Sequence, residues 1–139
     1  MYRGVRGESP TLKRGSRQVG RLGGVEVGLK GRTERVIDDS LLTRHVGGKG
    51  VFATPAMILL MENTAHGSVA PHLAADQTTV GYEVCVKHLG PSQPGATVVV
   101  TSLLKAVNGN KLLFDVECHD GDRLVGTGTH KRAVVPALV

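Results

Sequence analysis

Three side chains in this sequence have types and a spacing that could carry out acyl transfer: Thr54, Glu62 and His88. Glu62 follows an apolar run, and a buried carboxylate costs free energy unless a partner satisfies it or chemistry uses it. A histidine beside such a carboxylate provides a general base or activates a nucleophile. Free N–H groups at a helix start near Thr54 could stabilise an oxyanion. The structural alternative is that Thr54 only caps a helix, Glu62 has a backbone or arginine partner, and His88 lies in a loop.

A single long helix is predicted to position Thr54 and Glu62. The Thr54 hydroxyl suits an N-cap, and Pro55 suits the first helical position, where its missing N–H costs nothing. The helix is predicted from about Thr54 to Ala70, with Pro71 marking its end. Its apolar run leaves no polar face, which predicts a buried helix. The spacing separates Thr54 and Glu62 by about 80° around the axis and about 12 Å along it, so both can line one cleft.

The remaining segments alternate between apolar and polar residues, as strands do. Strands are predicted over residues 24–37, 78–88, 96–107, 111–119 and 124–135, with an irregular segment over 40–53. The second of these strands places Val80, Tyr82, Val84 and Val86 on one face and ends at His88. One strand, one helix and four antiparallel strands indicate the α+β class, with a curled sheet wrapped around the helix. The hot-dog fold has this arrangement, and its outer strands usually pair with a second copy, which predicts a homodimer.

The length of 139 residues fits one domain with its own core. We expect this domain over residues 23–139, preceded by a basic, Gly-rich extension over residues 1–22. The first 24 residues carry six basic side chains and one acidic one, whereas 11 basic and 11 acidic residues balance in the remainder. Nucleic-acid contact is one interpretation of this extension. A solvated, partly disordered extension is favoured, because no aromatic side chains lie between the charges to stack on bases.

The cysteines and the hydropathy predict a cytoplasmic protein without membrane contact. Cys85 and Cys118 are isolated, have no zinc-site spacing, and accompany no secretory signal, which indicates a reducing compartment. No run approaches the ~18 apolar residues that a membrane span needs. No metal site is predicted, because the other histidines lack the i, i+4 spacing of helical metal ligands. These histidines, expected to be surface or supporting residues, are His66, His72, His119 and His130. His130 shares a strand face with Arg132.

Several short motifs occur in a fixed order between about Val51 and Val135. They are Val51-Phe52-Ala53-Thr54, Met61-Glu62, Cys85-Val86-Lys87-His88, Pro94-Gly95-Ala96-Thr97-Val98, His119-Asp120-Gly121 and Gly126-Thr127-Gly128-Thr129-His130-Lys131-Arg132-Ala133-Val134. Each motif is weak alone, but their order and spacing are fairly specific. Together they make the sequence resemble the fluoroacetyl-CoA thioesterase family of hot-dog proteins.

The resemblance implies a homodimeric acyl-CoA thioesterase whose coenzyme A is part of the substrate, with no cofactor. The family's catalytic threonine, glutamate and histidine fall on Thr54, Glu62 and His88, and its substrate-contacting glycine and arginine fall on Gly81 and Arg132. Glu62 would then attack the thioester or activate water, His88 would move a proton, and Thr54 would orient the carboxylate or the substrate. On residue type alone, Gly81 predicts a bulge and Arg132 a solvated charge at the end of a strand.

The segment before Thr54 departs from the family pattern. The fluoroacetyl-specific member has phenylalanines there that form an apolar lid, whereas this chain has His45-Val46-Gly47-Gly48-Lys49-Gly50. We therefore expect another small or medium acyl-CoA. The alternative is a non-catalytic acyl-CoA-binding or regulatory hot-dog protein, although a pure binder would not require the Thr–Glu–His set. An acyl-CoA dehydratase fits less well, because the helix centre has Glu62 without a nearby histidine.

Overall fold

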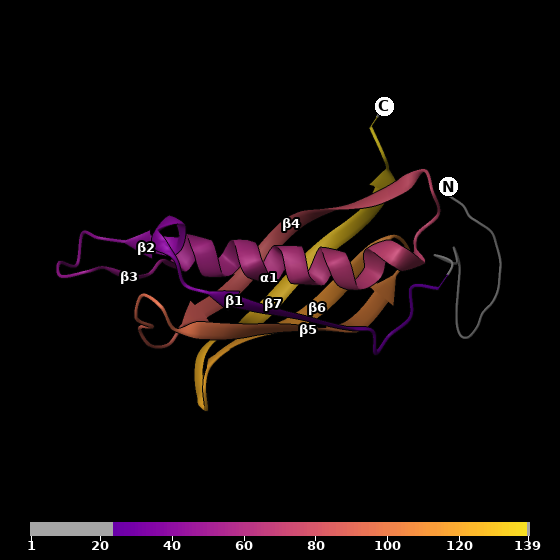
Figure 1. Cartoon of the computed structure of the whole chain (residues 1–139). Coiled ribbons are helices and arrows are strands. Elements are labelled where there is room, and N and C mark those ends of the chain that lie inside the picture. Colours follow the sequence, from indigo (N-terminus) through magenta and orange to yellow (C-terminus); the bar gives the residue numbers. More distant parts are fainter. Residues whose placement is uncertain (1–23, 139) are drawn as a thin grey trace.

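The computed structural model describes residues 24–138, in which one long helix lies across one face of an antiparallel sheet (Figure 1). The elements in chain order are β1 (Lys30–Val36), η2 (Asp39–Leu41), β2 (Leu42–Thr43), β3 (Val51–Phe52), α1 (Thr54–Val69), η3 (Ala70–His72), β4 (Gln77–His88), β5 (Thr97–Asn108), β6 (Lys111–Asp120) and β7 (Arg123–Pro136). The predicted α+β class is confirmed. The predicted extension over residues 1–22 lies outside the described residues, as do residues 23 and 139.

The main sheet has five strands in the order β1-β5-β6-β7-β4, and each neighbouring pair is antiparallel. Tight connections join β5 to β6 and β6 to β7, where Gly109 and Gly121 adopt φ values of 62° and 60°. Both turns were predicted from the sequence, because glycine adopts positive φ without a steric cost. β4 forms one edge of the sheet, so its outer backbone groups have no strand beside them in the described chain.

Helix α1 buries one face and leaves another exposed. The buried residues recur at helical spacing and are Met57, Leu60, Met61, Thr64, Ala65 and Val69. They pack against strand residues that include Val100, Phe114 and Val116. The prediction of a helix buried all round is wrong, because Leu59 is 56% exposed and Asn63 and Gly67 lie on the same open side. No helix within residues 24–138 is long and apolar enough to cross a membrane.

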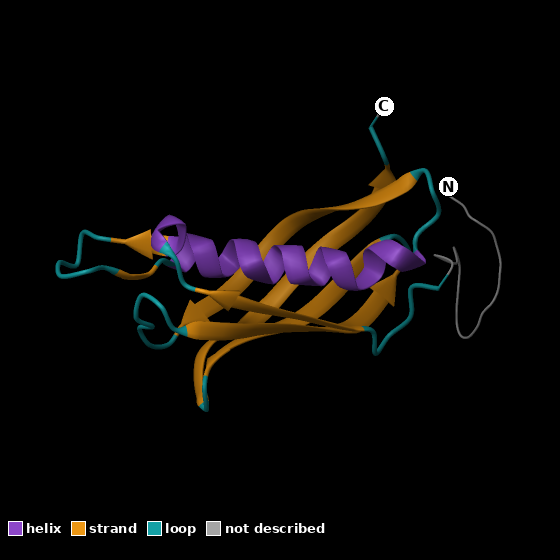
Figure 2. Ribbon diagram, in the orientation of Figure 1, coloured by secondary structure: helices purple, strands orange, loops and turns teal. Residues whose placement is uncertain are grey.

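The first strand is shorter than predicted, because the chain turns before it. Gly28 has a φ of 101°, and its N–H donates to the carbonyl of Leu104 at 2.8 Å. β1 therefore begins only at Lys30. The segment predicted as irregular contains the short β2–β3 hairpin, which extends beyond the start of α1 (Figure 2).

Strand β4 contains a bulge that reverses which residues face the helix. Gly81 pairs with Arg132 and Glu83 with Lys131, so Tyr82 is the extra residue. Thr79 is buried before the bulge, whereas Val80 and Tyr82 are 47% and 51% exposed. After the bulge the even-numbered residues turn inward. The prediction that Val80, Tyr82, Val84 and Val86 share one face is therefore wrong, because a bulge interrupts the alternation of a strand.

Candidate functional site

The start of α1 brings Thr54 to His88. The N-cap is Ala53, Thr54 is the first helical residue, and no side chain caps this end. The predicted N-cap role of Thr54 is therefore wrong by one position. The Thr54 hydroxyl is hydrogen-bonded to Nδ1 of His88, with Oγ1 and Nδ1 2.8 Å apart. This bond joins the first residue of the helix to the last residue of β4.

His88 has one nitrogen without a hydrogen-bond partner. Its ring meets Phe52 edge to face, with centroids 5.9 Å apart and planes at 81°. Nε2 is buried and makes no hydrogen bond within the described part of the chain. Burial lowers the pKa of His88, which favours the neutral ring at neutral pH. A neutral imidazole with a free nitrogen can exchange a proton with a bound molecule.

A cavity of about 360 Å³ lies beside Thr54 and His88. Its other walls come from the β2–β3 hairpin and from the turn after β4, and they include Thr43, His45, Val46 and Leu89. The Thr43 hydroxyl and Nδ1 of His45 are hydrogen-bonded at 2.6 Å. The cavity therefore has a hydroxyl and an imidazole on the hairpin side and a second such pair on the helix side.

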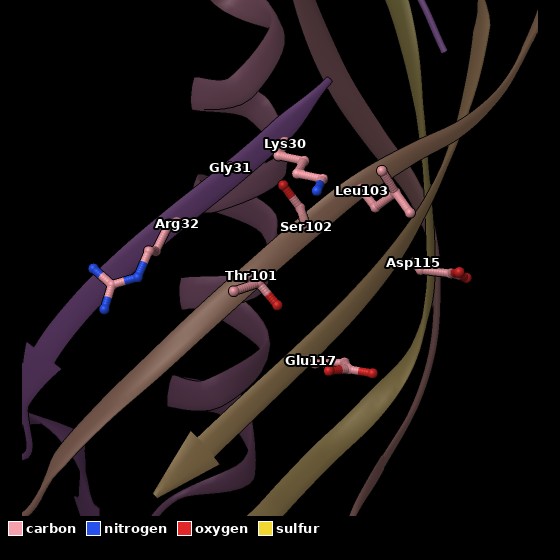
Figure 3. A pocket seen from close by; sticks show the side chains of 8 residues that line it. All are labelled: Lys30, Gly31, Arg32, Thr101, Ser102, Leu103, Asp115 and Glu117. Carbon is pink, nitrogen blue, oxygen red and sulfur yellow. The ribbon is translucent and has the colours of Figure 1, made fainter. Parts of the chain in front are cut away.

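A larger hollow, of about 480 Å³, lies along β1, β5 and β6 (Figure 3). Basic residues of β1 and acidic residues of β6 border it, together with Thr101 and Leu103 of β5. Asp115 there pairs with Lys105 at 3.5 Å. None of the predicted site residues lines this hollow, and it contains no histidine or cysteine. We therefore place the candidate site at the smaller cavity.

Glu62 lies two helical turns beyond Thr54 and is only half-buried, so the predicted deep burial of this carboxylate is wrong. Among the described residues, the side-chain carboxylate of Glu62 makes no hydrogen bond or ion pair. Burial lowers the pKa values of Arg132 and His130, and the negative charge of Glu62 opposes both shifts. The structure thus joins Thr54 to His88 directly and places Glu62 within electrostatic range of Arg132.

Arg132 is only 8% exposed, so it is not the solvated charge that its residue type alone predicts. Its Nε donates to the Thr79 hydroxyl at 2.8 Å, and its Nη2 donates to the Thr79 carbonyl at 3.0 Å. Its Nη1 lies 3.1 Å from Nε2 of His130. Burial lowers the pKa of Arg132, and the charge of Glu62 opposes this effect. Arg132 is therefore held inside the domain by neutral partners.

Gly81 lies opposite Arg132 in the β4–β7 pair, at the bulge predicted from its residue type. A Cβ at this position would come within 2.9 Å of Cε1 of His130 and 3.1 Å of Nη1 of Arg132. Real Cβ atoms essentially never show a 2.9 Å contact, so the ring would have to shift. Because Gly81 has no side chain, the His130 ring and the Arg132 guanidinium can pack directly against the backbone of β4.

His130 is buried, with 1% of its surface exposed, and it is not a surface residue. Its Nδ1 lies 2.8 Å from the carbonyl of Glu83, and its ring stacks on Phe114. Sequence reasoning placed His130 on the strand face of Arg132 but did not predict their contact. The signal available in the sequence was the alternation of a strand, which turns His130 and Arg132 to the same face of β7, and the structure buries both side chains.

The family model described as fluoroacetyl-CoA-specific thioesterase (FlK) matches residues 30–137. The fluoroacetyl-CoA thioesterase of Streptantibioticus cattleyicolor is 42% identical over 85 residues, which span 61% of this chain and 61% of that relative. The chain thus matches about three fifths of that relative's length.

Solved structures share the fold. The structure of the fluoroacetyl-CoA thioesterase FlK superposes with a TM-score of 0.75 and 35% identity, over 81% of this chain and 90% of that one. A hot-dog-like protein from Thermanaerovibrio acidaminovorans superposes with a TM-score of 0.73 and 24% identity, over 80% and 84% of the two chains. The predicted hot-dog fold and the predicted family resemblance are confirmed.

Proposed function

Because this chain belongs to the family of fluoroacetyl-CoA-specific thioesterases, we propose that it hydrolyses an acyl-CoA thioester. The observation that carries the proposal is the hydrogen bond between Thr54 and His88 at the wall of a cavity. A neutral histidine with one fixed nitrogen and one free nitrogen suits proton transfer during thioester cleavage. Both residues fall within the part of the chain that matches the family.

In the proposed reaction, water adds across the bond between the acyl carbon and the thiol sulfur. In one route Glu62 takes a proton from water, the resulting hydroxide adds to the acyl carbon, and the C–S bond breaks to give the acid and the thiolate. In the other route the Glu62 carboxylate adds to the acyl carbon and the C–S bond breaks to leave an anhydride, which water then cleaves to release the acid and restore the carboxylate. His88 transfers the proton that the departing thiolate needs, and Thr54 fixes the orientation of the imidazole. Gly81 and Arg132 contact the substrate, since the bare backbone at Gly81 allows close approach and Arg132 supplies N–H donors.

We propose a small or medium acyl group other than fluoroacetyl. The cavity of about 360 Å³ is of a size that holds small molecules. The β2–β3 hairpin contributes Thr43 and His45 to its wall and only one phenylalanine, Phe52, where a fluoroacetyl-specific lid is expected to have several. A panel of acyl-CoAs of increasing length checks this proposal, and fluoroacetyl-CoA as the best substrate would contradict it.

We also propose that the working form is a homodimer. β4 is an edge strand, and its exposed face carries Val80 and Tyr82, while Leu59 is exposed on α1. An open edge with apolar side chains is a surface that proteins usually cover. Sedimentation equilibrium should give twice the chain mass of 14.6 kDa. A molar mass of one chain at all concentrations would contradict the dimer.

The decisive test of the proposed hydrolysis is thiol release from the acyl-CoA panel by the wild type and by Glu62→Gln. The change removes the charge and keeps the side-chain size, and we expect turnover to fall by about 100-fold or more. Glu117→Gln is the matched control, because Glu117 lies on β6 at the larger hollow and should keep full activity.

The alternative function is that of an acyl-CoA-binding protein without catalysis. The observation in its favour is that the Glu62 carboxylate makes no hydrogen bond to Thr54 or His88, so this alternative is tested as well. Calorimetric titration with non-hydrolysable acyl-CoA distinguishes the two. Binding without turnover on any thioester would support the binding protein and overturn the hydrolase. Loss of turnover in Glu62→Gln with retained binding would support catalysis.

A further inference from the structure

We propose that His130 is a positioning residue that holds the guanidinium of Arg132 in the orientation in which it meets the substrate. This inference rests on the proposed thioester hydrolysis, because it concerns an arginine of the same site. His130 itself has no place in the proposed reaction. Its two ring nitrogens are both committed to protein groups, one on β4 and one on Arg132.

The hydrogen bonds determine the tautomer of His130. Nδ1 lies 2.8 Å from the carbonyl oxygen of Glu83, and a carbonyl can only accept, so Nδ1 carries the proton. Arg132 can only donate, so the 3.1 Å contact from its Nη1 requires a lone pair on Nε2. The ring is therefore neutral with its proton on Nδ1. A proton on Nε2 would bring two donors together and break the contact.

The other partners of Arg132 leave only two of its donors free. Thr79 accepts from Nε through its hydroxyl and from Nη2 through its carbonyl. With the His130 contact, three of the five N–H groups of the guanidinium are used. The two remaining N–H groups, one on Nη1 and one on Nη2, are left to donate to a substrate. Glu62 supplies the negative charge that acts on this group from α1.

The His130 ring is fixed well enough to direct another side chain. It stacks on Phe114 with centroids 6.3 Å apart and planes at 28°, and its Cε1 fills the space that a Cβ at Gly81 would need. A ring that is packed on both sides and hydrogen-bonded to the backbone has one available orientation. The charged groups that act on it are Arg132 on its own strand and Glu62 on α1.

Two amide substitutions separate the two nitrogens of His130. His130→Gln places an amide oxygen near the position of Nε2, where it can accept from Arg132. His130→Asn reaches only the position of Nδ1, where it can donate to the carbonyl of Glu83. A residue that only stabilises the fold would be affected similarly by both changes. A residue that directs Arg132 is rescued by glutamine and not by asparagine.

We expect His130→Asn to lower kcat/KM about 10-fold, because it removes one hydrogen bond to a charged group. His130→Gln should stay within about 3-fold of the wild type. In an Arg132→Gln background, His130→Asn should have no further effect, since residues that act through one another are not additive. Equal losses for Asn and Gln, or a full additional loss in the Arg132→Gln background, would overturn the inference.

Thr79 gives an independent test if the His130 variants do not fold. Thr79→Val removes the hydroxyl that accepts from Nε of Arg132 and is also hydrogen-bonded to Nδ1 of His66, whereas Thr79→Ser keeps it. The Arg132→Gln background separates the two bonds, because there Thr79→Val should have no further effect if the hydroxyl acts through Arg132. We expect valine to lower kcat/KM and serine to restore it, and equal rates would count against positioning through Arg132. A wild type that cleaves no thioester would overturn the proposed function and this inference together. A wild type that cleaves thioesters, with equal Asn and Gln variants, would overturn only the inference.

Discussion

Two regions of this domain combine a histidine with a threonine, and they use them in opposite ways. At the start of α1, His88 has one hydrogen bond, to Thr54, and a second nitrogen without a partner among the described residues. Between β4 and β7, both nitrogens of His130 are occupied, and Thr79 and Arg132 complete a buried network. A histidine with a free nitrogen can exchange a proton with a substrate, whereas the two hydrogen bonds of His130 suit it to holding its neighbours in place.

The largest effect should come from the first region. His88→Gln removes the exchangeable proton, and we expect kcat for acyl-CoA hydrolysis to fall by about 100-fold. The free energy of unfolding should change by less than about 1 kcal/mol, since a single hydrogen bond is lost. Thiol-release kinetics and urea denaturation measure the two quantities. A variant that loses stability but keeps its turnover would reverse the assignment of the two regions.

A substitution in the second region, between β4 and β7, should lower the free energy of unfolding. Gly81→Ala places a Cβ 2.9 Å from the fixed His130 ring, and overpacking of this kind costs about 1–3 kcal/mol. Gly67→Ala is the matched control, because it lies in α1 with nothing within 4 Å of the added Cβ. There alanine should stabilise the helix by up to about 1 kcal/mol. Chemical denaturation of both variants checks this contrast, which fails if the two changes have the same sign.

The smallest effect is a pH dependence to which both regions contribute. Burial lowers the pKa values of His88 and His130 below their ordinary value of 6.5, and that of His66 as well. The unfolded chain therefore binds more protons than the folded chain as the pH falls below 6.5. The stability from these neutral rings is present above that pH and is lost as the pH falls through the folded values.

Urea denaturation between about pH 7.5 and about pH 5.5 measures this loss. His130→Gln removes one of the titrating rings, so its stability should vary less steeply with pH than that of the wild type. His88→Gln should flatten the dependence in the same way. A wild type that is equally stable at both ends of this range would contradict the neutral assignment of the buried histidines.

Regular alternation is the part of this fold that sequence could predict. In β6 the predicted inward residues Leu112, Phe114, Val116 and Cys118 are all buried, because the pattern runs through them without interruption. In β4 the same reasoning failed, because a bulge depends on the pairing of two strands and leaves only a glycine as its local sign. The class and the order of elements were predicted for the same reason that β6 was.

The sequence names the candidate site residues, but it says less about which of them contact one another. Residue type assigned Thr54 to a local cap, and only the family resemblance placed it in one site with His88, the residue 34 positions away to which its hydroxyl is hydrogen-bonded. Thr79, which accepts two of the hydrogen bonds of Arg132, lies 53 positions away on β4, so no local pattern predicts these bonds. The spacing in α1 did place Glu62 beyond Thr54, but only packing could show that its charge acts on Arg132. Contacts between distant segments depend on the fold as a whole.

The extra residue in β4, Tyr82, changes which alternate residues of the strand face inward. Before Tyr82, the odd-numbered residue Thr79 faces inward and binds Arg132. After Tyr82, the even-numbered residues face inward, and the last of them is His88. One strand thereby supplies both regions, although an unbroken strand would turn either Thr79 or His88 to the outside. If this site were transferred to another antiparallel sheet, the extra residue at position 82 would have to be transferred too, because it decides which side chains of the strand face inward.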